Sequence, residues 1–205
     1  MNCDRIAPWY RWFEYAGFGR ALERRRFAFL DALADARRVL VLGDGDGRFL
    51  ERLARANRGA CIDYVDLSGR MLELARGRAG MERIRYRQAD ARTVPLGAAR
   101  YDLIVTHFFL DCFSEEDAAH VIARIVAAAQ PDARWLISEF RAGGWAQLWL
   151  PMLYAFFRVT TGLRTRRLVD HHPLLACRGF ALERLERSRF GMLASELWRR
   201  TRMDQ

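Results

Sequence analysis

The chain has 205 residues, is 51% hydrophobic and carries a net charge of +9. This length suits one domain with a sizeable core, and the composition excludes a disordered chain. No apolar run is long enough to span a bilayer and no signal-peptide core stands at the start, so we expect a cytoplasmic protein. The scattered cysteines have neither metal-site nor disulfide spacing. All of the basic charge is arginine. This indicates either an anionic partner or a genome that encodes its basic residues as Arg.

Residues 1–36 precede the first predicted strand. Residues 6–15 are dense in aromatic side chains, including Trp9 and Tyr10. They fit a lid over a ligand as well as a packed N-terminal helix. Residues 21–33 have the apolar spacing of an amphipathic helix.

A glycine-rich turn follows the first strand. Residues 39–42 are branched aliphatics, and Gly43, Gly45 and Gly47 alternate after them, before a predicted helix over 48–58. Glycine allows positive φ and lets a ligand approach the backbone closely. In open α/β sheets this turn binds nucleotides.

The other residues of the turn indicate which nucleotide is bound. A dinucleotide fingerprint requires glycine where Arg48 stands, and a phosphate loop requires lysine, which the chain lacks altogether. Asp44 and Asp46 would repel a pyrophosphate and tolerate a cation. A phosphate-free nucleoside with a positive centre, such as S-adenosylmethionine, fits this turn.

Acidic residues follow the next two predicted strands. The strand over 60–66 ends on Asp66, 21 residues after Gly45, where a carboxylate can accept both ribose hydroxyls. Ser68 can cap the next helix. Leu67, just before this cap, and Met71, in the helix, are further candidate cofactor contacts. The strand over 84–88 leads to Asp90, which could accept from the exocyclic amine of a base or cap a short turn.

The strand over 101–107 is almost wholly apolar, as expected for a central parallel strand. It ends on His107, a candidate general base or an ordinary packed side chain. Asp111, in the loop that follows, could orient His107 or bind an acceptor amine. Ser114 and Asp117 form a capping box for a helix over 115–129, Pro131 breaks that helix, and residues 135–140 predict the fifth strand.

The C-terminal part begins with residues 145–161, which are apolar on all sides and predict a buried cover helix or a surface for an apolar ligand or a bilayer. The basic residues 164–167 leave attachment to the inner face of a membrane open. His171 and His172 open a short helix that Gly179 ends. As sequence neighbours they should point apart, so we expect a structural role and no metal. Residues 181–190 and 192–198 predict two closing strands with antiparallel pairing.

These motifs resemble the class I S-adenosylmethionine-dependent methyltransferases. They are closest to the small-molecule branch that includes the ubiquinone/menaquinone biosynthesis C-methyltransferases. The segments that carry the resemblance are residues 4–10, 39–47, 101–113 and 177–180, with Asp66 and Asp90.

The resemblance implies an α/β, Rossmann-like, seven-stranded and mostly parallel sheet, with helices on both faces, an antiparallel last strand and an N-terminal helical lid. It implies one domain over 1–205, divided into lid helices (1–36), a cofactor-binding half (37–140) and a cover helix with closing strands (141–205). Asp90 and the backbone of Ala91 would contact the adenine. The acceptor pocket would be walled by Trp9, Tyr10, Trp145, Trp149 and Phe157.

Two departures from the family pattern affect the expected function. Val41 stands where the family usually has an acid, for which Asp44 or Asp46 could substitute, and the loop after the fourth strand has Asp111 and Cys112 where the family often has His. We expect methyl transfer from S-adenosylmethionine, giving S-adenosylhomocysteine, to a small apolar or amphiphilic acceptor. The alternatives are an RNA methyltransferase, which the absence of an Asn/Asp-Pro-Pro loop disfavours, and a cofactor-binding regulatory protein without turnover.

Overall fold

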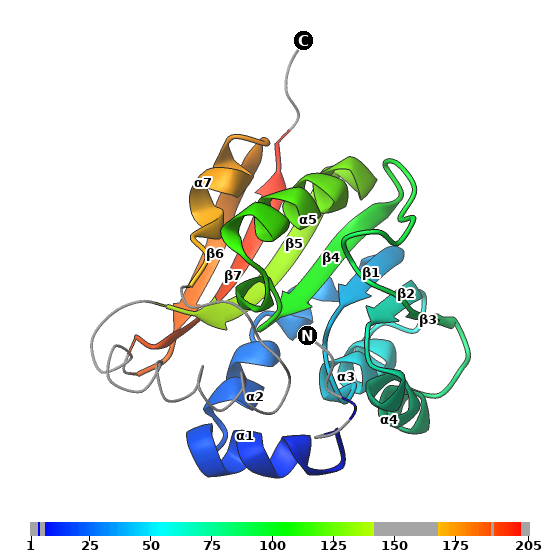
Figure 1. The fold of residues 1–205 in the computed structure, drawn as a ribbon. Coiled ribbons are helices and arrows are strands. Elements are labelled where there is room, and N and C mark those ends of the chain that lie inside the picture. Colours follow the sequence, from blue (N-terminus) through cyan, green and yellow to red (C-terminus); the bar gives the residue numbers. More distant parts are fainter. Residues whose placement is uncertain (1–3, 5–6, 142–167, 190, 202–205) are drawn as a thin grey trace.

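The structure is a computed structural model that describes residues 4, 7–141, 168–189 and 191–201 (Figure 1). Its seven-stranded sheet has the order β3-β2-β1-β4-β5-β7-β6. The strands β1 to β5 pair in parallel, and β7 lies antiparallel between β5 and β6. The expected Rossmann-like sheet with an inserted antiparallel last strand is confirmed.

The strands are β1 (Arg38–Leu42), β2 (Cys61–Asp66), β3 (Ile84–Gln88), β4 (Tyr101–His107), β5 (Ala129–Phe140), β6 (Phe180–Arg187) and β7 (Leu193–Arg200). The helices of the described part are α1 (Tyr10–Phe18), α2 (Ala21–Arg26), α3 (Arg48–Ala56), α4 (Gly69–Ala79), α5 (Glu115–Ala128) and α7 (His171–Ala176). Short 3-10 turns occur at Ala7–Trp9, Leu30–Leu33 and Leu110–Cys112. The side chains of Ser68 and Ser114 cap α4 and α5 as predicted.

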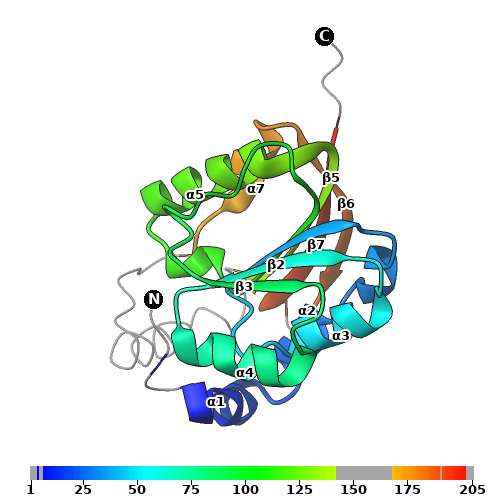
Figure 2. The same ribbon diagram turned by 90° about the vertical axis from the view of Figure 1, so that its right-hand side faces the viewer.

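Helices cover both faces of the sheet (Figure 2). On one face, Val121 and Ile125 of α5 and Leu175 of α7 pack in a cluster with Leu40 and Ile104. Helices α3 and α4 pack against the other face. Because successive residues of a strand point to opposite faces, a strand buried on both sides is apolar throughout. This explains why β1 and β4 are nearly continuous runs of aliphatic residues.

The strand order changes direction between β1 and β4. From β1 the chain winds outward through β2 to β3 and then returns to place β4 on the other side of β1. Open α/β sheets bind ligands at the carboxyl ends of the strands at such a switch point. The turn after β1, the end of β2, the loop after β3 and the end of β4 therefore lie along one edge of the sheet.

Two predicted elements differ from the structure. The helix expected over 21–33 divides into α2 and a 3-10 turn, because Phe29 has a left-handed φ of 62°. Pro131 does not separate helix from strand but lies inside β5, where the register with β4 shifts. Proline lacks the N–H that a regular ladder needs and is tolerated at such irregularities. The expected cover helix over 145–161 lies outside the described residues.

The structure tests the expectation that no segment spans a membrane. Among the described residues, no helix is both long enough and apolar enough to cross a bilayer. The division of the chain at residues 36 and 140 and attachment to a membrane surface stay predictions.

Candidate cofactor and acceptor site

The glycine turn after β1 is the centre of the candidate site. Gly43, Gly45 and Gly47 all have positive φ. A Cβ on Gly43 would lie 2.4 Å from Cδ2 of Phe109, and one on Gly47 would lie 2.6 Å from Cα of Ala75 in α4. The turn is therefore packed between the loop after β4 and helix α4, and neither of these two positions has room for a side chain.

Asp66 lies beside this turn, as its spacing predicted. The backbone N–H of Gly43 donates to the carbonyl of Val65 at 2.9 Å, and the hydroxyl of Tyr64 donates to the carbonyl of Gly45 at 2.8 Å. The Asp66 carboxylate accepts from the N–H of Ser68 at 2.8 Å. Burial raises the pKa of Asp66 to about 6, although the N–H groups of Ser68 and Gly45 oppose the shift.

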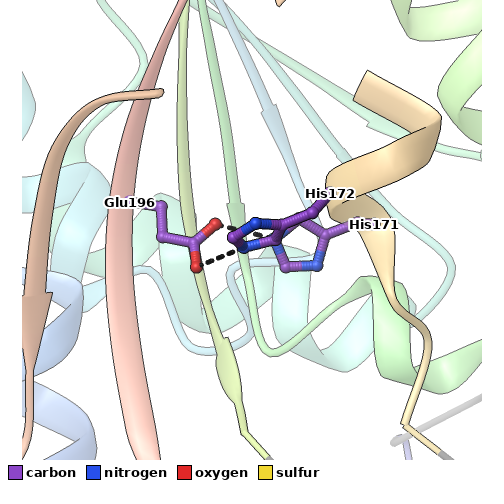
Figure 3. A group of neighbouring side chains, drawn as sticks. All are labelled: His171, His172 and Glu196. Carbon is purple, nitrogen blue, oxygen red and sulfur yellow. Dashed lines mark hydrogen bonds and ion pairs between the residues drawn. The ribbon is translucent and has the colours of Figure 1, made fainter. Parts of the chain in front are cut away.

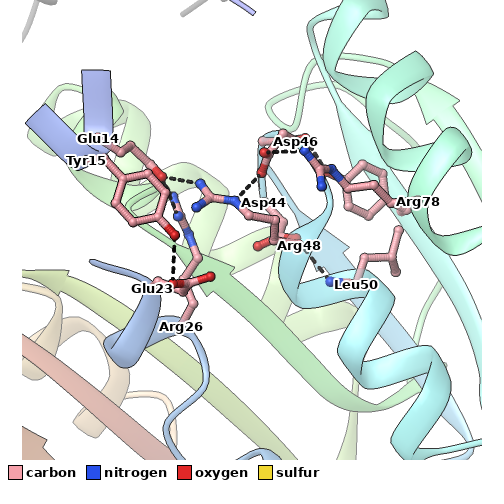
Figure 4. A network of polar contacts seen from close by, with 11 residues as sticks. Glu14, Tyr15, Glu23, Arg26, Asp44, Asp46, Arg48, Leu50 and Arg78 are labelled. Carbon is pink, nitrogen blue, oxygen red and sulfur yellow. Dashed lines mark hydrogen bonds and ion pairs between the residues drawn. The ribbon is translucent and has the colours of Figure 1, made fainter. Parts of the chain in front are cut away.

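Of the two acidic residues of the turn, Asp46 is neutralised by the protein's own arginines, whereas Asp44 is not paired with one in the part of the chain that the structure describes (Figure 4). One oxygen of Asp46 accepts from Nε of Arg48 at 2.8 Å, and the other accepts from Nη2 of Arg78 at 3.2 Å. Asp44 is buried, and its Oδ2 accepts from the N–H of Leu50 at 3.3 Å. Its Oδ1 is buried with no hydrogen-bond partner among the described residues. The turn is thus not the net acidic surface that its sequence indicated, and Asp44 alone keeps an oxygen for a ligand.

Glu14 of α1 connects the arginines of this network, and the sequence analysis did not identify it. Its carboxylate accepts from Arg26 of α2 at 2.9 Å, with a second bond to the same guanidinium, and from Arg48 of α3. All three side chains are almost fully buried. Burial alone would raise the pKa of Glu14, but the two guanidinium groups outweigh it and lower that pKa to about 2. A single acid in an amphipathic helix carries no local signal for this role.

The remaining predicted cofactor contacts follow β2 and β3 and differ in exposure. Met71 is buried in a small cluster with Ala7 and Tyr10, whereas Leu67 is exposed. Asp90 follows β3, and its carboxylate is held by Arg92 at 2.7 Å, which lowers its pKa. Ala91 is buried beside it. A ligand amine at Asp90 would therefore share this carboxylate with Arg92.

His107 ends β4 and is 1% exposed, with its ring 4.6 Å from that of Phe49 in an edge contact. Neither ring nitrogen has a hydrogen-bond partner among the described residues. Burial and the nearby Arg26 hold the pKa of His107 well below its usual range, so its ring is neutral at pH 7. A general base must become charged when it takes a proton, and this environment disfavours that form.

Asp111 pairs with Glu139 at the end of β5. Glu139 accepts from the backbone N–H groups of Phe109 and Leu110 at 3.0 and 2.8 Å, and it fixes the loop that lies against Gly43. The two carboxyl groups hydrogen-bond each other. Burial raises the pKa of Asp111 to about 6, and burial together with Asp111 raises the pKa of Glu139 well above its usual range. A charged residue at the end of an apolar strand was the sequence signal for Glu139.

We expect Glu139→Gln to remove a pH dependence of stability. The folded state favours the protonated carboxyl, so its contribution is present below the unfolded pKa of about 4.5 and is lost as pH rises through the raised folded pKa. An amide keeps both backbone contacts and donates to Asp111. The variant should match the wild type at pH 5 and exceed it by about 1–3 kcal/mol at pH 8, in urea unfolding. Glu73→Gln, on the exposed face of α4, is the control, and a Glu139→Gln profile parallel to the wild type would contradict the expectation.

The predicted acceptor wall is described only in part. Tyr10 lies against the turn, 3.5 Å from where a Cβ on Gly45 would stand, whereas Trp9 is 61% exposed. Trp145, Trp149 and Phe157 lie outside the described residues. A cavity of about 300 Å³ occurs at the opposite, amino ends of the strands, beside Arg38 and Asp63, and does not belong to this site.

His171 and His172 do not point apart as expected. Both rings contact Glu196 of β7, each through Nε2 and each at a different carboxylate oxygen, at 2.8 and 2.9 Å. Two side chains at the first turn of a helix can converge when a carboxylate with two oxygens stands between them. The sequence cannot show this, because Glu196 is brought to α7 only by the insertion of β7 into the sheet.

The glycine turn after β1, the acid after β2 and the further acid after β3 lie where open α/β sheets bind nucleosides, at a topological switch point. Residues 39–132 match the family described as a methyltransferase domain. This match covers somewhat less than half of the chain, and a solved methyltransferase structure shares its fold.

Two curated relatives match a little over half of this chain. Over 124 residues the chain is 35% identical to malonyl-[acyl-carrier protein] O-methyltransferase of Enterobacter lignolyticus, covering 54% of this chain and 48% of the relative. Over 119 residues it is 32% identical to demethylmenaquinone methyltransferase of Deinococcus radiodurans, covering 57% and 48%. The chain therefore spans about half the length of these curated relatives.

A solved structure matches nearly the whole chain. The 1,6-didemethyltoxoflavin-N1-methyltransferase of Burkholderia thailandensis, with bound 1,6-didemethyltoxoflavin and S-adenosylhomocysteine, aligns with a TM-score of 0.65 and 21% identity. The alignment covers 96% of this chain and 88% of that one. At this identity the likeness shows the shared fold.

Proposed function

We propose that the protein transfers a methyl group from S-adenosylmethionine to a small apolar or amphiphilic acceptor. The observation that carries the proposal is the position of Asp66 beside the glycine turn at the β1–β4 switch point, within a methyltransferase domain. The two curated relatives are named for methylating malonyl-[acyl-carrier protein] and demethylmenaquinone. Neither name refers to a nucleic acid, which favours an acceptor of another class here.

Residues at the carboxyl edge of the sheet would contact the ribose, the adenine and the methionine end of the cofactor. Asp66 would accept the ribose hydroxyls, and Ala91 with Asp90 would bound the adenine. The buried and unpartnered Oδ1 of Asp44 would accept from the ammonium of the methionine end. Asp44 would thereby take the role of the acid that the family usually has at the position of Val41. Asp46 is less suited to this role, since both of its oxygens are already held by arginines.

Catalysis of methyl transfer depends mostly on positioning and desolvation, because the positive charge of the sulfonium disperses as the methyl group leaves. His107 and Asp111 are the candidate catalytic residues. His107, a neutral imidazole at the end of β4, would be the base for an acceptor that must lose a proton. Asp111 would bind the acceptor or hold the loop through Glu139. If His107 takes part, His107→Ala lowers turnover with little loss of cofactor affinity. Equal turnover removes His107 from the mechanism.

The function is tested by incubating the purified chain with S-adenosylmethionine that carries a labelled methyl group. Small-molecule, lipid and RNA fractions of a cell extract serve as acceptors. Label in the small-molecule or lipid fraction supports the proposal. Label in RNA alone establishes the nucleic-acid alternative, and tight cofactor binding without label in any fraction establishes a binding protein without turnover.

Asp66→Ala is expected to weaken binding of S-adenosylhomocysteine by at least about 100-fold. The change removes hydrogen bonds from the ribose hydroxyls to a charged acceptor, each of which contributes about 1.5–3 kcal/mol. Isothermal titration calorimetry measures the effect. Asp31→Ala, which removes an exposed acid from the 3-10 turn before β1, should leave affinity unchanged. Unchanged affinity in Asp66→Ala would place the ribose elsewhere.

A further inference from the structure

We propose that His171, His172 and Glu196 form a binding site for a divalent transition-metal ion, with Zn²⁺ as the ion that fits best. The two rings project from the start of α7 toward Glu196 on β7 (Figure 3). The three ligand atoms lie within 4.8 Å of one another. Two imidazole nitrogens and one carboxylate oxygen are a ligand set that leaves a fourth tetrahedral position for water.

The contacts of Arg141 carry the proposal furthest. Nη1 of Arg141 lies 2.7 Å from Nε2 of His172 and 3.1 Å from Oε1 of Glu196. A guanidinium can only donate hydrogen bonds, so Nε2 of His172 presents its lone pair to it. His172 and Glu196 then place two lone-pair atoms 2.9 Å apart, an arrangement that is stable only with a cation between them. In this structure the cation is the side chain of Arg141.

A metal ion satisfies the same acceptors with shorter and more directional bonds. Glu196 faces the two rings with one carboxylate oxygen each, so both oxygens are directed at the position between the three side chains. The indole N–H of Trp198 donates to its Oε2 at 2.9 Å and orients it, as hydrogen bonds from outside the ligand set orient metal ligands. His171 and Glu196 are buried, whereas the side chain of His172 is 30% exposed and gives access to solvent.

The metal would exchange places with Arg141. The Arg141 side chain is 31% exposed and belongs to the residue directly after β5, at the carboxyl edge of the sheet. An ion bound to the three ligands would join α7 to β7 and release the guanidinium toward that edge. The backbone of Val169, just before α7, donates to Asp111 at 3.2 Å. The site is therefore coupled to the loop that carries one of the candidate catalytic residues.

The experiment titrates Zn²⁺ into the full chain after removal of metal with a chelator, in competition with a chromophoric chelating dye. We expect one ion per chain and a rise in Tm with Zn²⁺, because an ion that binds only the folded state stabilises it. His172→Ala and Glu196→Gln should each weaken binding by at least about 10-fold. His120→Ala removes an exposed histidine of α5 and should leave affinity unchanged.

Arg141→Ala separates a metal site from an ordinary ion-pair cluster. It leaves all three ligands intact and removes the competing cation, so Zn²⁺ should bind more tightly than to the wild type. If the cluster serves only as an ion-pair network, the variant loses stability and Zn²⁺ does not restore it. Absence of stoichiometric Zn²⁺ binding, or equal affinity in His172→Ala and the wild type, overturns the proposal. Binding of S-adenosylhomocysteine, measured in parallel, is independent of either result.

Discussion

Replacing Glu14 with alanine is expected to destabilise the protein by about 3–5 kcal/mol, because it leaves buried charges without their partner. Arg26 and Arg48 both donate to the Glu14 carboxylate, and all three side chains are nearly excluded from solvent (Figure 4). Without Glu14, Arg26 has no carboxylate within salt-bridge distance in the described part of the chain, whereas Arg48 keeps Asp46. Unfolding in urea at pH 7 measures the loss.

The pH dependence of this effect has a definite sign. The folded pKa of Glu14 is lowered from 4.5 to about 2. Its contribution is therefore fully present above pH 4.5 and is lost as pH falls toward 2. The difference in unfolding free energy between the wild type and Glu14→Ala should shrink over this interval.

Glu23→Ala is the matched control for Glu14→Ala. Glu23 lies on the neighbouring helix α2 and accepts from the hydroxyl of Tyr15 at 3.0 Å, a neutral and partly exposed donor. Its removal should cost only about 1 kcal/mol. An equal loss in the two variants would show that the buried arginines do not depend on Glu14.

Gly47→Ala is expected to destabilise the protein by about 2–4 kcal/mol and to weaken cofactor binding. A φ of +77° is strained for any residue with a Cβ. The added Cβ would also lie 2.6 Å from Cα and Cβ of Ala75. Backbone atoms of a packed helix cannot move aside locally, so the turn and α4 must separate. Calorimetry with S-adenosylhomocysteine and urea unfolding measure the two effects.

The same substitution in the adjacent helix should have the opposite sign. Gly77 lies on the exposed side of α4, and a Cβ there would meet nothing within 4 Å. Alanine is favoured over glycine inside a helix by about 0.5–1 kcal/mol, so Gly77→Ala should stabilise the protein. A loss in Gly47→Ala no larger than about 0.5 kcal/mol would show that the turn can relax around the new methyl group.

The strands and the cofactor edge could be predicted because they depend on local patterns. Residues 84–88 and 101–107 were predicted with the bounds of β3 and β4. Once the strands were assigned as parallel, the glycine turn, Asp66 and Asp90 had to lie along one edge, since all follow carboxyl ends of strands. The shorter segments were less certain. One left-handed residue at Phe29 divides a helix whose apolar periodicity continues through it.

The partners of the charged residues could not be predicted. The sequence shows Asp44 and Asp46 but not that Arg78 and Arg48 hold Asp46, nor that Glu14 supports Arg48 from 34 residues away. It shows His107 at the end of a strand and Asp111 in the loop that follows. The structure instead pairs Asp111 with Glu139 and leaves His107 buried and neutral.

The sequence by itself determined the sheet, the glycine turn and the acids at its carboxyl edge. Periodicity, glycine spacing and strand ends act over a few residues and are visible in the chain. Only the tertiary structure decided which charges meet: Glu14 with Arg26 and Arg48, Asp111 with Glu139, and two adjacent histidines with Glu196. Electrostatic pairing depends on distance in space and on burial. Both are set by how helices and strands pack after the chain has crossed the sheet, and neither is encoded in the order of neighbouring residues.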